Sequence, residues 1–145
     1  MRGLLQRVKE ASVSVDGEVV GRIGEGLCAL VGVSRDDDEG SSDRLARKIW
    51  QIRLFADDAG NMNRSAAELG LAVLVVSQFT LCADTSRGRR PSFVGAAAPE
   101  LAEPLVERVV KQLRLAGAEV ATGTFGAKMQ LKLTNDGPVT VLVET

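Results

Sequence analysis

Histidine is absent from this chain of 145 residues. Without it, neither a Ser-His-Asp triad nor a Cys-His pair can form within the chain, and zinc-hydrolase motifs of the His-Glu-x-x-His kind are excluded. Histidine is also the side chain whose ordinary titration falls nearest neutral pH. Any enzyme built on this sequence must therefore work without the most common general base.

Cysteine is scarce as well, with only Cys28 and Cys82 in the chain. Their wide separation does not match the spacing of metal ligands, so we expect no metal, and nothing in the sequence calls for a cofactor. Cys28 lies in an apolar run and is expected to be a small core residue. A disulfide is not expected, because the N-terminal residues turn polar too soon for a secretion signal.

Long apolar runs and an excess of one charge are also missing. No apolar run approaches the roughly 20 residues that a membrane-spanning helix needs, so we expect no membrane partner and a cytoplasmic location. The 18 Lys and Arg residues nearly balance the 19 Asp and Glu residues, so attraction to nucleic acid must come from local patches. With 45% hydrophobic residues, the length fits one domain spanning residues 1–145.

The hydrophobic pattern predicts an α+β domain. Alternating or continuous apolar segments indicate strands, and two amphipathic segments indicate helices, the first capped by Ser41 or Ser42 and the second stopped by Gly117. The expected strands span residues 4–15, 18–23, 26–33, 53–55, 71–78, 119–122, 129–134 and 139–144, and the expected helices span about 41–52 and 99–116. Two helices leave part of the sheet uncovered, which favours an oligomer.

A glycine–proline pair, Gly137-Pro138, interrupts an alternating apolar pattern near the end of the sequence. Proline cannot donate to a sheet ladder, and glycine permits backbone shapes that other residues resist. The plainest interpretation is a turn between two strands, because Asn135 and Asp136 before the pair are ordinary turn residues. In the alternative interpretation, the pair forms part of a site that selects a small molecule by its shape. Backbone carbonyls would be exposed there, Gly137 has no side chain, and the Gly-Pro peptide bond can be cis.

A second unusual segment, Ser77-Gln78-Phe79-Thr80-Leu81, leaves a buried strand and enters a polar loop. Polar residues at the end of a central strand often form a rigid site. Thr80 is a possible nucleophile, but no histidine can activate it, and backbone N–H groups near Phe79 and Thr80 offer an oxyanion hole instead. In the alternative interpretation, these hydroxyls only satisfy local backbone groups.

Two basic features are open to two interpretations each. Arg87, Arg89 and Arg90 form the densest basic cluster, which is either a phosphate-binding loop or a solvated one. Arg7 is the only charged residue in the stretch Leu4–Val8. It is either buried against backbone carbonyls, such as those around Gly137-Pro138, or facing water from an edge strand.

Over essentially its whole length, the chain resembles the D-aminoacyl-tRNA deacylases, the family once called D-tyrosyl-tRNA deacylases. The resemblance is highly specific because Ser-Gln-Phe-Thr and Asn-Asp-Gly-Pro-Val-Thr occur together at these positions, although each motif alone is weak. The matching segments are Gln6-Arg7-Val8, Ala11-Ser12-Val13, Gly32-Val33, Gly60-Asn61-Met62-Asn63, Ser77-Gln78-Phe79-Thr80-Leu81, Arg90-Pro91-Ser92-Phe93, Gly126-Ala127-Lys128-Met129-Gln130 and Asn135-Asp136-Gly137-Pro138-Val139-Thr140.

The resemblance implies a homodimer of α+β subunits, each with a mostly antiparallel, barrel-like sheet and two main helices, and with active sites at the subunit interface. Gly137-Pro138, as a Gly-cis-Pro pair, would enter the partner's pocket and exclude L-amino acids, while D-amino acids and glycine would pass. Arg7 would hold the orientation of the pair. The pocket for the aminoacylated adenosine of tRNA would be lined by Ser77, Gln78, Phe79 and Thr80, with Met129 and Asn135 as further substrate-binding residues.

In this family the terminal 2′-hydroxyl of the tRNA is expected to assist ester hydrolysis, with the protein placing the ester and a water molecule. Orientation alone can supply several kcal/mol, which suits a chain without histidine. Thr80 as a covalent nucleophile is the less favoured mechanism.

Two other functions stay open, namely a non-catalytic nucleic-acid-binding module and an editing domain that removes L-amino acids from tRNA. The sequence departs from the family pattern in two places. Pro104 stands inside the second expected helix, and the segment 87–90 is more basic than the resemblance requires.

Overall fold

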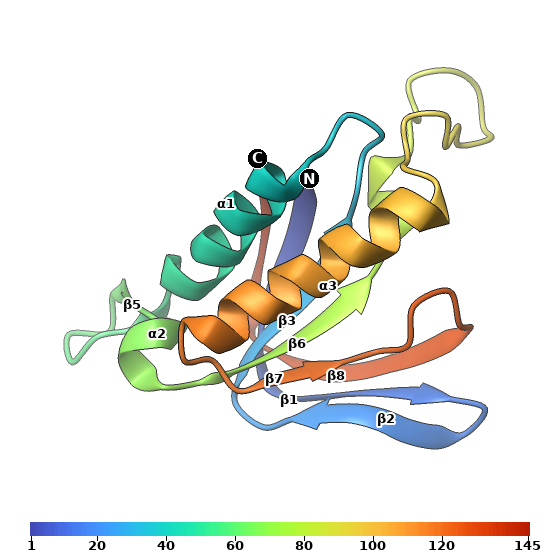
Figure 1. The fold of residues 1–145 in the computed structure, drawn as a ribbon. Coiled ribbons are helices and arrows are strands. Elements are labelled where there is room, and N and C mark those ends of the chain that lie inside the picture. The colour runs from blue at the N-terminus through green and yellow to red at the C-terminus, as the bar shows by residue number, and fades with distance from the viewer.

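A curled six-stranded sheet with two long helices on one face accounts for most of the molecule (Figure 1), and the computed structural model describes all residues from 1 to 145. The strands are β1 (Arg2–Val15), β2 (Glu18–Ile23), β3 (Gly26–Gly32), β4 (Arg53–Ala56), β5 (Met62–Ser65), β6 (Ala72–Ser77), β7 (Val120–Thr122) and β8 (Met129–Glu144). The helices are α1 (Glu39–Gln51), α2 (Ala66–Leu69) and α3 (Pro99–Leu115), and a 3-10 turn, η1, spans Phe79–Cys82.

The long strand β1 organises the sheet. It pairs antiparallel with β8 along one edge and with β3 and β2 along the other, and β3 is continued by the parallel strands β6 and β7. The sheet curls until β7 lies against β2. The approach is so close that a Cβ atom placed on Gly21 of β2 would lie 2.4 Å from the carbonyl oxygen of Thr122 in β7. The predicted α+β domain with a mostly antiparallel, barrel-like sheet is confirmed.

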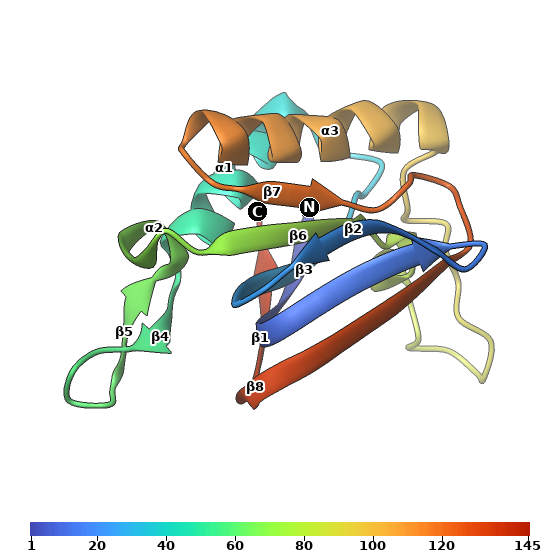
Figure 2. The same ribbon diagram turned by 90° about the horizontal axis from the view of Figure 1, so that it is seen from below.

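The helical layer lies on one face of the sheet, and the β4–β5 hairpin projects away from it (Figure 2). The N-cap of α1 is Asp38, whose carboxylate accepts a hydrogen bond from the Ser41 amide. The prediction that Ser41 or Ser42 caps this helix is wrong. Both serines lie inside the first turn, where their hydroxyls donate to Asp38 and to the Leu105 carbonyl. None of the helices is long and apolar enough to cross a lipid bilayer.

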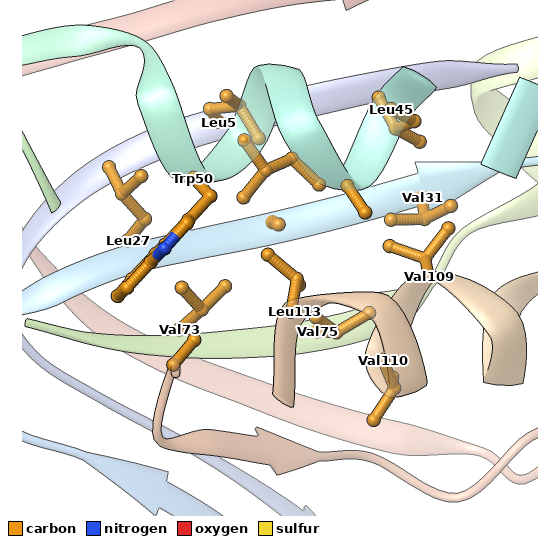
Figure 3. Packing of buried hydrophobic residues seen from close by; sticks show 14 of the residues in the cluster. Leu5, Leu27, Val31, Leu45, Trp50, Val73, Val75, Val109, Val110 and Leu113 are labelled. Atoms are coloured by element: carbon orange, nitrogen blue, oxygen red, sulfur yellow. The ribbon is translucent and has the colours of Figure 1, made fainter. Parts of the chain in front are cut away.

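The main core lies between the helices and the sheet (Figure 3). A smaller cluster, which includes Val8, Val13, Cys28 and Leu74, fills the inside of the curl. Cys28 is a buried core residue, as predicted, and its burial raises the pKa of the thiol to about 12. The residues labelled in the main core are Leu5, Leu27, Val31, Leu45, Trp50, Val73, Val75, Val109, Val110 and Leu113.

Residues 129–144 form one strand, not the two strands that the sequence predicts. The chain passes through Gly137-Pro138 without reversing, and β8 stays antiparallel to β1 on both sides of the pair. The register shifts on β1 between Gln6 and Val8 and again between Val8 and Glu10, so the ladder between β1 and β8 is irregular beside the pair. The interpretation of the pair as a plain turn is therefore wrong.

Replacement of Leu113 by alanine should reduce the free energy of unfolding by about 2–5 kcal/mol, because it leaves a cavity where α3 packs on the sheet. Replacement of Leu115, whose side chain is 71% exposed on the same helix, should change it by no more than about 0.5 kcal/mol. Urea unfolding of both variants checks this. Equal losses in the two variants would contradict the packing of α3 on the sheet.

Candidate active site

A sharp turn follows the buried strand β6. Ser77, the last residue of β6, pairs with Val31 of β3, and the Gln78 amide donates to the Val31 carbonyl at 2.7 Å. The chain then leaves the sheet in the η1 turn, which the sequence did not predict. As a result Phe79 projects from the sheet with 57% of its surface exposed.

A mostly apolar groove of about 710 Å³ opens beside this turn. Its walls come from the ends of β3 and β6, the segment that leads into α3, the first two turns of α3, the loop 125–127 and the start of β8. The structure brings four of the predicted site residues to this groove: Ser77, Gln78, Phe79 and Met129. A groove of this volume has room for one small organic ligand.

Phe93 lies opposite Phe79 in the groove, with the two rings edge to face at a centroid distance of 5.1 Å. No sequence pattern assigned a role to Phe93, nor to Phe125 and Ala96–Ala98, which also line the groove. The one available signal was the matching segment Arg90-Pro91-Ser92-Phe93. Small apolar residues in a loop carry no pattern that points to a ligand.

Thr80 does not line the groove, but its hydroxyl oxygen accepts a hydrogen bond from the side-chain amide of Gln78, which does. An amide is not basic in either orientation, so Gln78 cannot take a proton from Thr80. The bond leaves the Thr80 O–H free to donate. This arrangement suits a hydrogen-bond donor better than an activated nucleophile.

Gly137-Pro138 lies on the exposed surface of β8, and its peptide bond is cis. Gly137 has a φ of +130°, a conformation that side-chain-bearing residues rarely adopt. A Cβ atom at this position would lie 2.8 Å from Nη2 of Arg7 and 2.9 Å from Cγ2 of Val139. Only glycine fits here without displacing its neighbours.

Arg7 is held against backbone carbonyls and does not face water, with its side chain only 16% exposed. Its Nε donates to the Asp136 carbonyl at 3.0 Å, directly before Gly137, and its Nη1 donates to the Leu54 carbonyl at 2.6 Å. One planar guanidinium therefore joins β1, β4 and the Gly137-Pro138 segment of β8.

Polar side chains secure the pair from both sides. Asn135 accepts a hydrogen bond from the Val139 amide and donates to the Thr140 hydroxyl, at 2.9 and 2.8 Å. The Asp136 carboxylate lies 3.4 Å from the Lys9 ammonium, and hydrogen bonding to Asp136 raises the pKa of Lys9. These contacts limit the freedom of the pair although it lies at the surface.

The groove and the Gly137-Pro138 pair do not meet within one chain, since neither residue of the pair lines the groove. Met129 and Leu131 at the start of β8 line the groove. Gly137 lies six residues beyond Leu131 on the same strand, a separation of up to about 20 Å at ~3.3 Å per residue. The structure thus separates Gly137, Pro138, Arg7 and Asn135 from the predicted residues of the groove.

The family model described as D-Tyr-tRNA(Tyr) deacylase matches residues 4–144. The chain is 54% identical to the D-aminoacyl-tRNA deacylase of Symbiobacterium thermophilum over 100% of this chain and 96% of that protein. It is 55% identical to the D-aminoacyl-tRNA deacylase of Streptomyces coelicolor over 99% of each.

Two solved structures share the fold. The c-Myc DNA Unwinding Element Binding Protein superposes with a TM-score of 0.95 at 38% identity, over 100% of this chain and 99% of that one. A probable eukaryotic D-amino acid tRNA deacylase superposes with a TM-score of 0.84 at 19% identity, over 99% and 98%.

The chain belongs to the D-Tyr-tRNA(Tyr) deacylase family. As a member of that family it is a hydrolase, which confirms the predictions of the family and of an enzyme.

Replacement of Arg7 by methionine should lower the free energy of unfolding by about 1–3 kcal/mol, because the carbonyl of buried Leu54 loses its partner. Replacement of Lys9 by methionine removes a cation next to the same Asp136 but from an exposed side chain, so its effect should be much smaller. Urea unfolding of both variants measures the difference. Equal effects would show that Arg7 contributes only its charge.

Proposed function

We propose that this chain hydrolyses the ester bond of D-aminoacyl-tRNA as a homodimer, in which Gly137-Pro138 of each subunit enters the groove of its partner and excludes L-amino acids. One observation carries this proposal. The pair is exposed and anchored by Arg7 and Asn135, yet neither of its residues lines the groove of the same chain. A second copy supplies a groove for the pair to enter.

The apolar groove suits the aminoacylated terminal adenosine of tRNA. The exposed ring of Phe79 and the facing ring of Phe93 offer aromatic surface on which a base can stack, and Met129 adds an adaptable apolar contact. Ser77 and Gln78, at the end of a buried strand, supply the few polar groups that set the orientation of a ligand.

L- and D-amino acids differ only in the direction of the side chain at one carbon atom. Backbone atoms placed close to that carbon can exclude one of the two by steric overlap. A rigid pair of residues without a side chain on Gly137 can lie close to the α-carbon of the substrate. An L-side chain would then overlap with the backbone of the pair, whereas a D-side chain points away and glycine has none. Discrimination comes from rejection of the wrong substrate rather than from recognition of the right side chain.

The chemistry requires no side-chain base. Water attacks the ester carbonyl, the bond from that carbon to the 3′-oxygen of the adenosine breaks, and the 3′-oxygen takes up a proton as the free amino acid leaves. The neighbouring 2′-hydroxyl of the tRNA can relay this proton, and placement of the ester contributes through orientation. Thr80, whose O–H is free to donate, assists as a hydrogen-bond donor.

The purified protein should release amino acid from D-tyrosyl-tRNA and glycyl-tRNA but not from L-tyrosyl-tRNA, with sedimentation showing a dimer. Hydrolysis of the three substrates in parallel tests this. Cleavage of the L-substrate would indicate an editing domain for L-amino acids. Salt-dependent binding of uncharged tRNA without any cleavage would indicate a nucleic-acid-binding module.

Replacement of Gly137 by alanine should reduce discrimination between D- and L-tyrosyl-tRNA by about 10²-fold, because the new Cβ displaces the guanidinium that holds the pair. Gly17→Ala is a matched control, since Gly17 also has a positive φ but no atom lies within 4 Å of the point that a Cβ would occupy there. The ratio of kcat/KM for the two substrates is the readout. A Gly137→Ala variant that folds and discriminates like the wild type would refute rejection by this pair.

A D-aminoacyl-tRNA ending in 2′-deoxyadenosine should be hydrolysed at least about 10²-fold more slowly than the ribose form. The Thr80→Ala variant should keep measurable activity, because loss of one hydrogen-bond donor costs about 10²–10³-fold. Single-turnover rates for both substrates and both proteins separate the mechanisms. If Thr80 were the nucleophile, the variant would lose all activity and the deoxy substrate would react normally.

A further inference from the structure

The loop between η1 and α3 carries three arginines that form no ion pair and no side-chain hydrogen bond within the chain. These residues, Arg87, Arg89 and Arg90, are exposed. By contrast, Arg7 donates to two carbonyls and Arg108 forms a bidentate pair with Asp43. The loop therefore presents three unneutralised charges, although the chain as a whole has a net charge of −1.

This basic loop is anchored at the edge of the groove. Asp84 and Ser92 close its base with two backbone hydrogen bonds of 2.8 and 2.9 Å, and Phe93 follows directly and forms part of the groove wall. Arg90 is three residues from Phe93, so at most about 10 Å of chain separates them. Figure 1 shows the loop projecting at the end of the molecule where β6 stops and α3 begins.

Charged residues of α3 line a smaller cleft beside the groove. This cleft of about 360 Å³ shares Ser77, Val106 and Phe125 with the groove. Its charged lining residues are Glu103, Glu107 and Arg114. Neither glutamate takes part in an ion pair. Two glutamates against one arginine leave this cleft with a net negative charge, which disfavours phosphates there.

We propose that Arg87, Arg89 and Arg90 bind backbone phosphates of the tRNA next to its terminal adenosine, so that the RNA leaves the groove over this loop and not over the Glu103–Glu107 cleft. The inference rests on the proposed function and adds the position of the RNA. Three arginines within four residues suit a phosphate chain, because arginine binds phosphate through paired N–H donors. A free amino acid or a nucleoside carries no phosphate for these arginines to bind.

Replacement of all three arginines by glutamine should weaken binding of uncharged tRNA and flatten its salt dependence. If each arginine neutralises one phosphate of a single strand, affinity of the wild type should fall about 20-fold more than that of the variant between 50 and 200 mM salt. The variant should hydrolyse D-tyrosyl-adenosine, which has no such phosphates, at the wild-type rate.

A second triple variant, Arg44→Gln, Arg47→Gln and Lys111→Gln, removes the same total charge from the exposed faces of α1 and α3. It should bind tRNA with nearly the wild-type salt dependence, because these cations lie on the helical layer. Equal flattening by the two triple variants, or none by the first, would overturn the proposal. An unchanged salt dependence in the first variant combined with tighter binding by Glu103→Gln/Glu107→Gln would place the RNA on α3 instead.

The measurement of tRNA binding distinguishes failure of this inference from failure of the proposed function. If D-tyrosyl-adenosine and D-tyrosyl-tRNA were both left intact by the wild type, the proposed hydrolysis would fail, while the salt dependence of tRNA binding would still decide the role of the basic loop.

Discussion

The hydrogen bonds of Arg7 are the interaction on which the rest of the candidate site depends. A single guanidinium at low exposure satisfies the carbonyls of Asp136 and Leu54 and lies against the position that a Gly137 side chain would occupy. A lysine could not make both bonds, because its one ammonium lacks the planar fork of donors. The arginine on β1 and the glycine on β8 therefore depend on each other, and the hydrogen bonds of Arg7 anchor a segment that lies at the surface.

The second constraint is the distance between the groove and the Gly137-Pro138 pair. A ligand-binding groove usually carries its own specificity elements, but here the pair lies further along β8 than the part of that strand that lines the groove. Selection by rejection fits such a division, because the excluding element needs to be rigid and correctly placed, not chemically reactive. The absence of histidine is consistent with the same division. A site that orients an ester next to the 2′-hydroxyl of the substrate's own ribose needs no side-chain base.

Much of the fold was predictable because its signals are local. The strands around Leu27 and Val73 are continuous apolar runs, and α3 is marked by Pro99 at its start and Gly117 after its end. The errors have local causes too. Asp38 outcompetes Ser41 as the N-cap of α1, and α2 is a single turn held by the Ser65–Glu68 capping box, too short to show a helical period. The η1 turn and β5 were missed for the same reason.

The sequence by itself determined that the chain is one α+β domain, that its chemistry proceeds without histidine, and that two short motifs set it in the D-Tyr-tRNA(Tyr) deacylase family. Those properties follow from composition, periodicity and residue identity. Only the tertiary structure decided that Gly137-Pro138 sits within a continuous strand rather than a turn, that Arg7 faces inward, and that the pair lies apart from the groove. The physical reason is that each of these depends on pairing between distant segments, since β1 provides both the ladder that keeps β8 extended and the guanidinium that holds it.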